Sequence, residues 1–93
     1  MVGVVIPAYN EENNISAVVK KVFSQAKPDF VVVVDDASRD ATGAVAEAAG
    51  AIVLRHEINR GQGAALETGH EYARRRGAEI VIDFDADGQL DRK

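Results

Sequence analysis

The stretch Phe30-Val31-Val32-Val33-Val34-Asp35-Asp36 sets five consecutive apolar residues directly before two acidic ones. An apolar run without polar alternation is typical of a strand that is covered on both faces, as in a parallel sheet. The sequence therefore predicts a buried strand over residues 30–34, which ends abruptly where the carboxylates begin.

Similar apolar runs lie on both sides of this strand, and amphipathic segments separate them. We expect further strands over residues 2–6, 51–54 and 79–84, and helices over about 12–26, 38–48 and 64–76. Ser38 is the expected N-cap of the second helix, whose predicted inner face comprises Ala41, Ala44, Val45 and Ala48. Four alternations of strand and helix predict an α/β fold with three αβα layers around a mainly parallel four-stranded sheet.

Composition and charge limit the classes of protein to which the chain can belong. Its 93 residues are 46% hydrophobic and 28% charged, which suits one small globular domain over 1–93. The net charge of −4, with both signs interspersed, argues against nucleic acid as a partner. No apolar run approaches the roughly 20 residues of a membrane span, and the N-terminal residues lack the basic segment of a signal peptide. The expected location is cytoplasmic, and the cluster Arg74-Arg75-Arg76 is expected to be a solvated last helical turn.

Acidic side chains follow two of the predicted strands. Asp35 and Asp36 end the second strand, and Asp85 and Asp87 follow the fourth. Because ligands of open parallel sheets bind beyond the carboxyl ends of the strands, these carboxylates are expected at one rim. Together with Gln89 they are hard oxygen donors, which suit Mg²⁺ or Mn²⁺ bridging to substrate phosphates. A D-x-D triplet taken alone more often merely solvates a loop.

The loop over residues 55–63 leaves two interpretations open. Gly61 and Gly63 precede a predicted helix, and such a loop can hold an anion or can serve as a flexible connection. The spacing matches neither the P-loop nor the three-glycine dinucleotide fingerprint. His56 and His70 lack a partner at metal-ligand spacing, so surface or packing roles are expected for both.

Four segments, in this order, resemble the family 2 glycosyltransferases. They are Val5-Ile6-Pro7-Ala8-Tyr9-Asn10-Glu11-Glu12, Val33-Val34-Asp35-Asp36-Ala37-Ser38-Arg39-Asp40-Ala41-Thr42, Asn59-Arg60-Gly61-Gln62-Gly63-Ala64-Ala65 and Asp83-Phe84-Asp85-Ala86-Asp87-Gly88-Gln89. The form D-A-D-G-Q is most similar to the polyprenyl-phosphate sugar transferases, of which the dolichyl-phosphate mannose synthases are one type.

This resemblance implies the N-terminal half of a GT-A fold, a Rossmann-like sheet that binds a nucleoside-diphosphate sugar. It implies a donor of the GDP-mannose or UDP-glucose type, a Mg²⁺ or Mn²⁺ ion, and a hexose acceptor such as a polyprenyl phosphate, with the parent enzyme at a membrane surface. Carried over by position, the nucleotide-binding residues are Pro7, Tyr9, Glu11, Asp36, Asp85 and Ala86. The metal ligands are Asp85, Asp87 and Gln89, and Asp36 is expected to accept a hydrogen bond from the base.

The chain departs from the family pattern after the D-x-D motif. Leu90-Asp91-Arg92-Lys93 stands where the family commonly has a His or similar residue and then Pro-Glu. The family's general base and later basic residues lie in a second half, so the expectation is a single subdomain truncated after this motif, with transfer belonging to the parent enzyme.

Two other readings compete with the transferase. The first is a non-catalytic nucleotide-binding fragment that self-associates as a homodimer through an exposed sheet edge. The second is a phospho-receiver domain, which also gathers carboxylates at strand ends and binds Mg²⁺. The receiver arrangement usually places its acidic pair after the first strand, whereas here the pair follows the second.

Overall fold

The computed structural model describes residues 1–86, which form four strands alternating with three helices. The sheet has the order β3-β2-β1-β4, and each neighbouring pair is parallel. The elements are β1 (Val2–Ala8), α1 (Ile15–Ala26), β2 (Phe30–Asp35), α2 (Thr42–Ala48), β3 (Ile52–Arg55), α3 (Gln62–Arg76) and β4 (Ile80–Asp83). The predicted α/β class and the parallel four-stranded sheet are confirmed.

The strand order also separates the transferase interpretation from the receiver one. A receiver-type sheet runs 2-1-3-4-5, which places β1 between β2 and β3. Here β1 lies between β2 and β4, and β3 is at the edge of the described sheet, as in the 3-2-1-4 order of the Rossmann type. The winding reverses direction between β1 and β4, so a ligand is expected beyond the carboxyl ends of those two strands.

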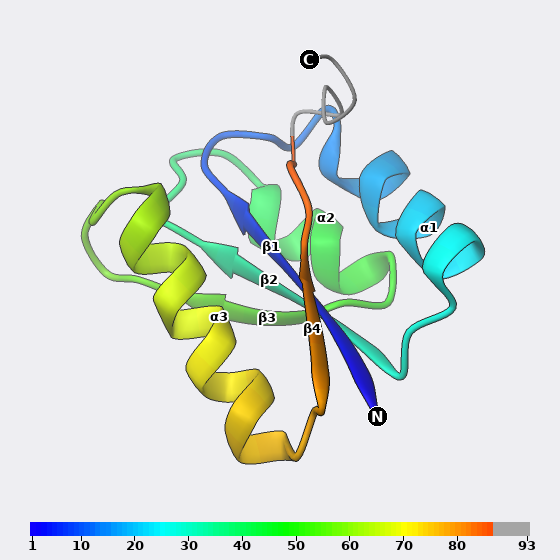
Figure 1. Ribbon diagram of the computed structural model, residues 1–93. Coiled ribbons are helices and arrows are strands. Elements are labelled where there is room, and N and C mark those ends of the chain that lie inside the picture. The colour runs from blue at the N-terminus through cyan, green and yellow to red at the C-terminus, as the bar shows by residue number, and fades with distance from the viewer. Residues whose placement is uncertain (87–93) are drawn as a thin grey trace.

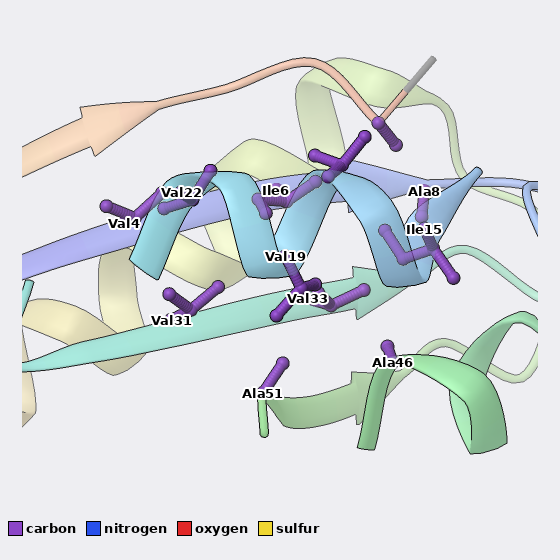
Figure 2. Close-up of a cluster of buried hydrophobic side chains, with 12 residues drawn as sticks. Val4, Ile6, Ala8, Ile15, Val19, Val22, Val31, Val33, Ala46 and Ala51 are labelled. Atoms are coloured by element: carbon purple, nitrogen blue, oxygen red, sulfur yellow. The ribbon is translucent and has the colours of Figure 1, made fainter. Parts of the chain in front are cut away.

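Helices cover both faces of the sheet, which gives the predicted three layers (Figure 1). Helices α1 and α2 lie on one face, where side chains from β1 and β2 form the larger core with the apolar stripe of α1 (Figure 2). This stripe contains Ile15, Val18, Val19 and Val22, all buried, with Phe23 packed beside them, as its helical spacing predicts. The opposite face is covered by α3, with a smaller core around Val5, Phe30, Val32 and Ala73.

Helix α3 crosses the sheet at very close range. A Cβ atom added to Gly69 would lie 2.3 Å from Cγ1 of Val5 and 3.3 Å from Cγ2 of Val34. The helix therefore rests on the sheet at a residue without a side chain. Further along, the rings of Tyr72 and Phe30 meet edge to face with centroids 5.9 Å apart, which orients the same helix.

Pro7 lies where β4 leaves the sheet. The last registered pair of β1 and β4 is Val5 with Asp83, and the N–H of Phe84 donates to the carbonyl oxygen of Val5. Pro7 has the same strand parity as Val5, so its backbone nitrogen faces the side from which β4 has departed. Because proline has no N–H, no donor is left unpaired there, and the two strands can separate at the end of the sheet.

The second helix begins later than predicted, and three of the four residues predicted for its inner face are exposed. It starts at Thr42, not Ser38, and its buried residues are Thr42 and Ala46. Ala41, Ala44 and Ala48 are exposed, whereas Val45 is half-buried and packs against the core, as predicted. The hydroxyl of Ser38 accepts the N–H of Asn10, and the N–H of Ser38 donates to Asp35, so Ser38 belongs to the turn after β2. The N-cap of the helix is Ala41, which has no side-chain cap, and the N–H of Thr42 donates to Oδ1 of Asp40.

Strand β4 is an edge of the described sheet and is poorly covered. Ile80, Val81 and Ile82 are all exposed, with Ile80 at 56%.

Helix α1 begins three residues later than predicted, and α3 begins two residues earlier. Among residues 1–86, no helix combines the length and the apolar character needed to cross a membrane.

Candidate functional site

A pocket of about 260 Å³ opens where β1 and β4 separate. Its walls come from the ends of β1, β2 and β4, the loop before α3 and the first turns of α3. All six residues predicted to bind nucleotide lie in its wall: Pro7, Tyr9, Glu11, Asp36, Asp85 and Ala86. The wall also contains Ala8, Asn59, Gly61, Gln62 and Ala65. Segments that are up to about 80 positions apart in the sequence thus meet at one site, as parallel topology requires.

Asp36 is the most constrained side chain of this pocket. It is 4% exposed, and its carboxylate accepts three hydrogen bonds. Oδ1 accepts from Nδ1 of His56 at 2.7 Å and from the N–H of Arg60 at 2.9 Å, and Oδ2 accepts from the N–H of Gly61 at 2.8 Å. Gly61 directly precedes α3, so the carboxylate also lies at the positive end of that helix.

The pKa of Asp36 reflects two opposed effects. Burial raises the pKa of the carboxyl, but the N–H groups of Arg60 and Gly61 and the ring of His56 lower it by more, so the pKa lies below its ordinary value. Asp36 is therefore ionised at neutral pH and acts only as an acceptor. It follows that Nδ1 of His56 carries the hydrogen of that bond.

Asp35 faces the other side of the strand end and has a different partner. Its carboxylate accepts from Nη1 of Arg55 at 2.7 Å and from the N–H of Ser38 at 2.9 Å, and it is buried. Arg55 also donates to the carbonyl oxygen of Ser38. Side-chain and backbone donors of the chain itself therefore already bind the carboxylates of Asp35 and Asp36, which the sequence grouped with Asp85 and Asp87 as oxygen donors suited to a cation.

The two loops nearest to β1 and β2 are joined to each other. The loop at residues 10–12 exchanges hydrogen bonds with residues 38–42, which holds the neighbours of Tyr9 and Glu11 beside the turn that follows Asp36. The bonds run from Asn10 N–H to Ser38 Oγ (2.8 Å), from Glu11 N–H to Thr42 Oγ1 (2.8 Å), from Arg39 N–H to Asn10 Oδ1 (2.8 Å) and from Ala41 N–H to Glu12 Oε1 (2.9 Å). This side of the pocket is therefore preorganised by backbone donors.

Asp85 differs from the two buried carboxylates. It is exposed at the pocket rim, and no hydrogen bond or ion pair engages it from within residues 1–86. Asp87 and Gln89, the other predicted metal ligands, lie outside the described residues. In the described part of the chain, no three acidic or histidine side chains are grouped so as to hold a metal ion. An exposed carboxylate that no donor of residues 1–86 engages fits a hard divalent cation, and the metal set stays a prediction.

The loop over residues 55–63 is pinned by contacts that the sequence did not reveal. Two of its N–H groups, at Arg60 and Gly61, hold the carboxylate of Asp36, so the anion bound there is part of the chain itself. Asn59 donates to the backbone carbonyl of Asp36, and His56 is buried with Nε2 2.8 Å from Thr68 Oγ1 of α3. His56 does pack inside the fold, as expected.

The remaining charged groups singled out in the sequence lie away from this pocket. Arg74 and Arg75 pair with Glu71, and Arg76 lies 4.7 Å from the ring centroid of Phe30, so the cluster is a solvated last turn at the far end of α3, as expected. His70 pairs at the surface with Asp83, its Nε2 2.6 Å from Oδ1. Neither group contributes a side chain to the pocket wall.

Comparisons with known proteins agree with this geometry. The model of the family "Glycosyl transferase family 2" matches residues 3–93. An uncharacterized protein of Methanocaldococcus jannaschii is 46% identical over 86 residues, covering 92% of this chain and 35% of that protein. The polyprenol monophosphomannose synthase of Mycolicibacterium smegmatis is 35% identical over 91 residues, covering 91% of this chain and 34% of the synthase.

A solved structure shares the fold. Glucosyl-3-phosphoglycerate synthase from Mycobacterium tuberculosis, crystallised with Mn²⁺, UDP and glucosyl-3-phosphoglycerate, superposes with a TM-score of 0.74 at 28% identity, covering 92% of this chain and 33% of that one. The chain thus spans about a third of the length of these relatives. A family match over almost the whole chain, carried on a sheet with the Rossmann strand order, shows that this chain belongs to glycosyltransferase family 2.

Proposed function

We propose that residues 1–93 build the donor-binding part of a metal-dependent glycosyltransferase, which holds a nucleoside-diphosphate sugar at the carboxyl ends of β1, β2 and β4. The observation that carries this proposal is the convergence of Pro7, Tyr9, Glu11, Asp36, Asp85 and Ala86 on one pocket. Those residues come from three separate strand ends. The same fold occurs in a synthase that was crystallised with Mn²⁺ and UDP, which supports the same ligand class here.

Each of the six predicted nucleotide-binding residues has a role in this proposal. Asp36 accepts a hydrogen bond from the base, and Tyr9, 44% exposed and aromatic, offers a surface on which the base can stack. Pro7 and Glu11 line the nucleoside end, and Asp85 and Ala86 lie at the end where the diphosphate would be held. Asp85, Asp87 and Gln89 would hold Mg²⁺ or Mn²⁺. Such an ion, when bound, neutralises charge on the departing nucleoside diphosphate.

The parent reaction is proposed as transfer of a hexose from a donor of the UDP-glucose or GDP-mannose type. The acceptor is proposed to be a polyprenyl phosphate, because a family relative is a polyprenol monophosphomannose synthase. A lipid acceptor would place the parent enzyme at the cytoplasmic face of a membrane. In this proposal the described pocket binds the donor side of that reaction, and the chain spans about a third of the length of its relatives.

The test is calorimetric titration of the 93-residue chain with UDP and GDP, each with and without Mn²⁺. We expect binding that requires the ion and that weakens at least about tenfold in Asp87→Ala, because a metal ligand is lost. Glu79→Ala is the matched control: it also removes a carboxylate, but its side chain lies beside the N-terminal amine, away from the pocket. Binding that ignores Mn²⁺, or that survives Asp87→Ala unchanged, would contradict the proposed donor site.

A further inference from the structure

The hydrogen-bonding capacity of Asp36 limits which base the pocket can hold. A carboxylate offers about four lone-pair positions, two on each oxygen. In Asp36, His56 and Arg60 fill both positions of Oδ1, and Gly61 fills one position of Oδ2. A single acceptor position, on Oδ2, remains for a ligand. We propose that this pocket selects uracil nucleotides over guanine nucleotides, an inference that rests on the donor-binding function proposed above.

The chemistry of the two bases makes the difference. Guanine presents two adjacent donors, the ring N1–H and the exocyclic amino group, which match the two oxygens of a free carboxylate. Uracil presents one ring N–H at N3, with a carbonyl on either side. With Oδ1 saturated, guanine would leave one of its two donors without an acceptor on Asp36, and a donor that binding leaves unpaired weakens binding. Uracil needs only one acceptor for its N3–H, and the remaining position on Oδ2 supplies it.

The two donors that fill the acceptor positions of Oδ1 are held in place by the fold. One of its donors is a backbone N–H, that of Arg60, and the other is the buried ring of His56. The opposite nitrogen of that ring is bonded to Thr68 of α3, so the ring cannot turn away without breaking a second hydrogen bond. His56 is therefore a positioning residue that acts on the base through Asp36, although it is absent from the pocket wall.

The experiment compares UDP, GDP and IDP by calorimetry on the unmodified chain with Mn²⁺. IDP has the ring system and N1–H of GDP but lacks the amino group, so it separates donor count from base size. We expect UDP to bind roughly tenfold or more tightly than GDP, and IDP to bind more tightly than GDP. His56→Ala should reduce the ratio of the Kd of GDP to the Kd of IDP, because it frees an acceptor position on Oδ1 for the second donor of guanine. His70→Ala, a histidine paired at the surface, should leave that ratio unchanged.

The outcomes separate this inference from the function on which it rests. If GDP binds as tightly as UDP, or as tightly as IDP, the proposed selection of the base is wrong, whereas the proposed donor binding is not contradicted. Failure of all three nucleotides to bind overturns both proposals. The comparison of IDP with GDP on the unmodified chain requires no variant, so it decides the question even if His56→Ala does not fold.

Discussion

Two adjacent aspartates at the end of β2 have separate tasks because successive side chains of a strand point to opposite faces. Asp35 closes the turn toward α2 and β3 by pairing with Arg55. Asp36 faces α3 and accepts hydrogen bonds from two N–H groups of the loop that precedes that helix. In the proposed site, the first aspartate is purely structural, whereas the second is both structural and ligand-facing.

The depressed pKa of Asp36 predicts a specific acid sensitivity. Because the folded-state pKa lies below the ordinary value, the stabilisation by Asp36 is complete above the ordinary carboxyl pKa, about 3.9, and is lost as the pH falls through that value toward the folded one. Asp36→Asn should lower the free energy of unfolding at pH 7 by roughly 2–3 kcal/mol, because the amide cannot accept all three bonds.

Urea denaturation of both proteins at several pH values between 7 and 3 measures this effect. The difference between the unmodified chain and Asp36→Asn should shrink as the pH falls, because the unmodified carboxylate becomes protonated while the amide does not change. The contributions of Asp40 and Glu71, whose pKa values are also lowered, are common to both proteins. A difference that stays constant over this pH range would show that the ionised carboxylate is not the source.

At the scale of elements, α3 depends on close approach at one residue. Gly69→Ala should lower the free energy of unfolding by about 1–3 kcal/mol, because its Cβ would overlap Val5 on the sheet. Gly63→Ala, in the first turn of the same helix, meets no atom within 4 Å and should be neutral or stabilise by about 0.5–1 kcal/mol. Thermal unfolding of both variants measures the contrast, and equal effects would mean that α3 does not rest on the sheet at Gly69.

The elements could largely be predicted from the sequence because their signals are local. The continuous apolar run of β2 and the apolar stripe of α1 follow from periodicity alone. The start of α2 could not be predicted, because Ser38 is a good cap by type but is engaged by Asn10, 28 positions earlier. Because α2 begins later than predicted, its buried residues are Thr42 and Ala46 and not those of the predicted inner face.

The site was predictable to the extent that it lies at strand ends. The parallel order of the elements already placed Asp36 and Asp85 at one rim, and the motif resemblance added Pro7 and Tyr9. The role of His56 was not foreseeable, since its partners Asp36 and Thr68 are 20 and 12 positions away and no motif marks the three. The pairing of Asp35 with Arg55 escaped prediction for the same reason.

At the scale of the whole molecule, β4 leaves an apolar strand exposed at the edge of the described sheet. Ile80 and Ile82 are registered with Val2 and Val4 of β1, so they share the face that α1 covers over its neighbours, yet both are exposed. An exposed apolar edge strand is a template for pairing with another chain. We therefore expect the 93-residue chain to self-associate as a homodimer through β4.

Light scattering coupled to size-exclusion chromatography tests this expectation over a range of concentrations. Ile80→Lys combined with Ile82→Lys should shift the population toward monomer, because charge on an edge strand opposes pairing. Ala48→Lys is the matched control, since it places the same charge on an exposed residue of α2. Equal masses for all three proteins at every concentration would contradict association through β4.

If the strand ends of β1, β2 and β4 form one donor pocket, UDP and Mg²⁺ must act on the residues of its wall, and amide chemical-shift mapping of the ¹⁵N-labelled chain measures this directly. We expect shifts at Tyr9, Glu11, Asp36, Gly61 and Asp85, all in the pocket wall, and none at Arg74–Arg76 at the far end of α3. Shifts centred on the far end of α3, or no shifts at saturating UDP and Mg²⁺, would contradict this expectation.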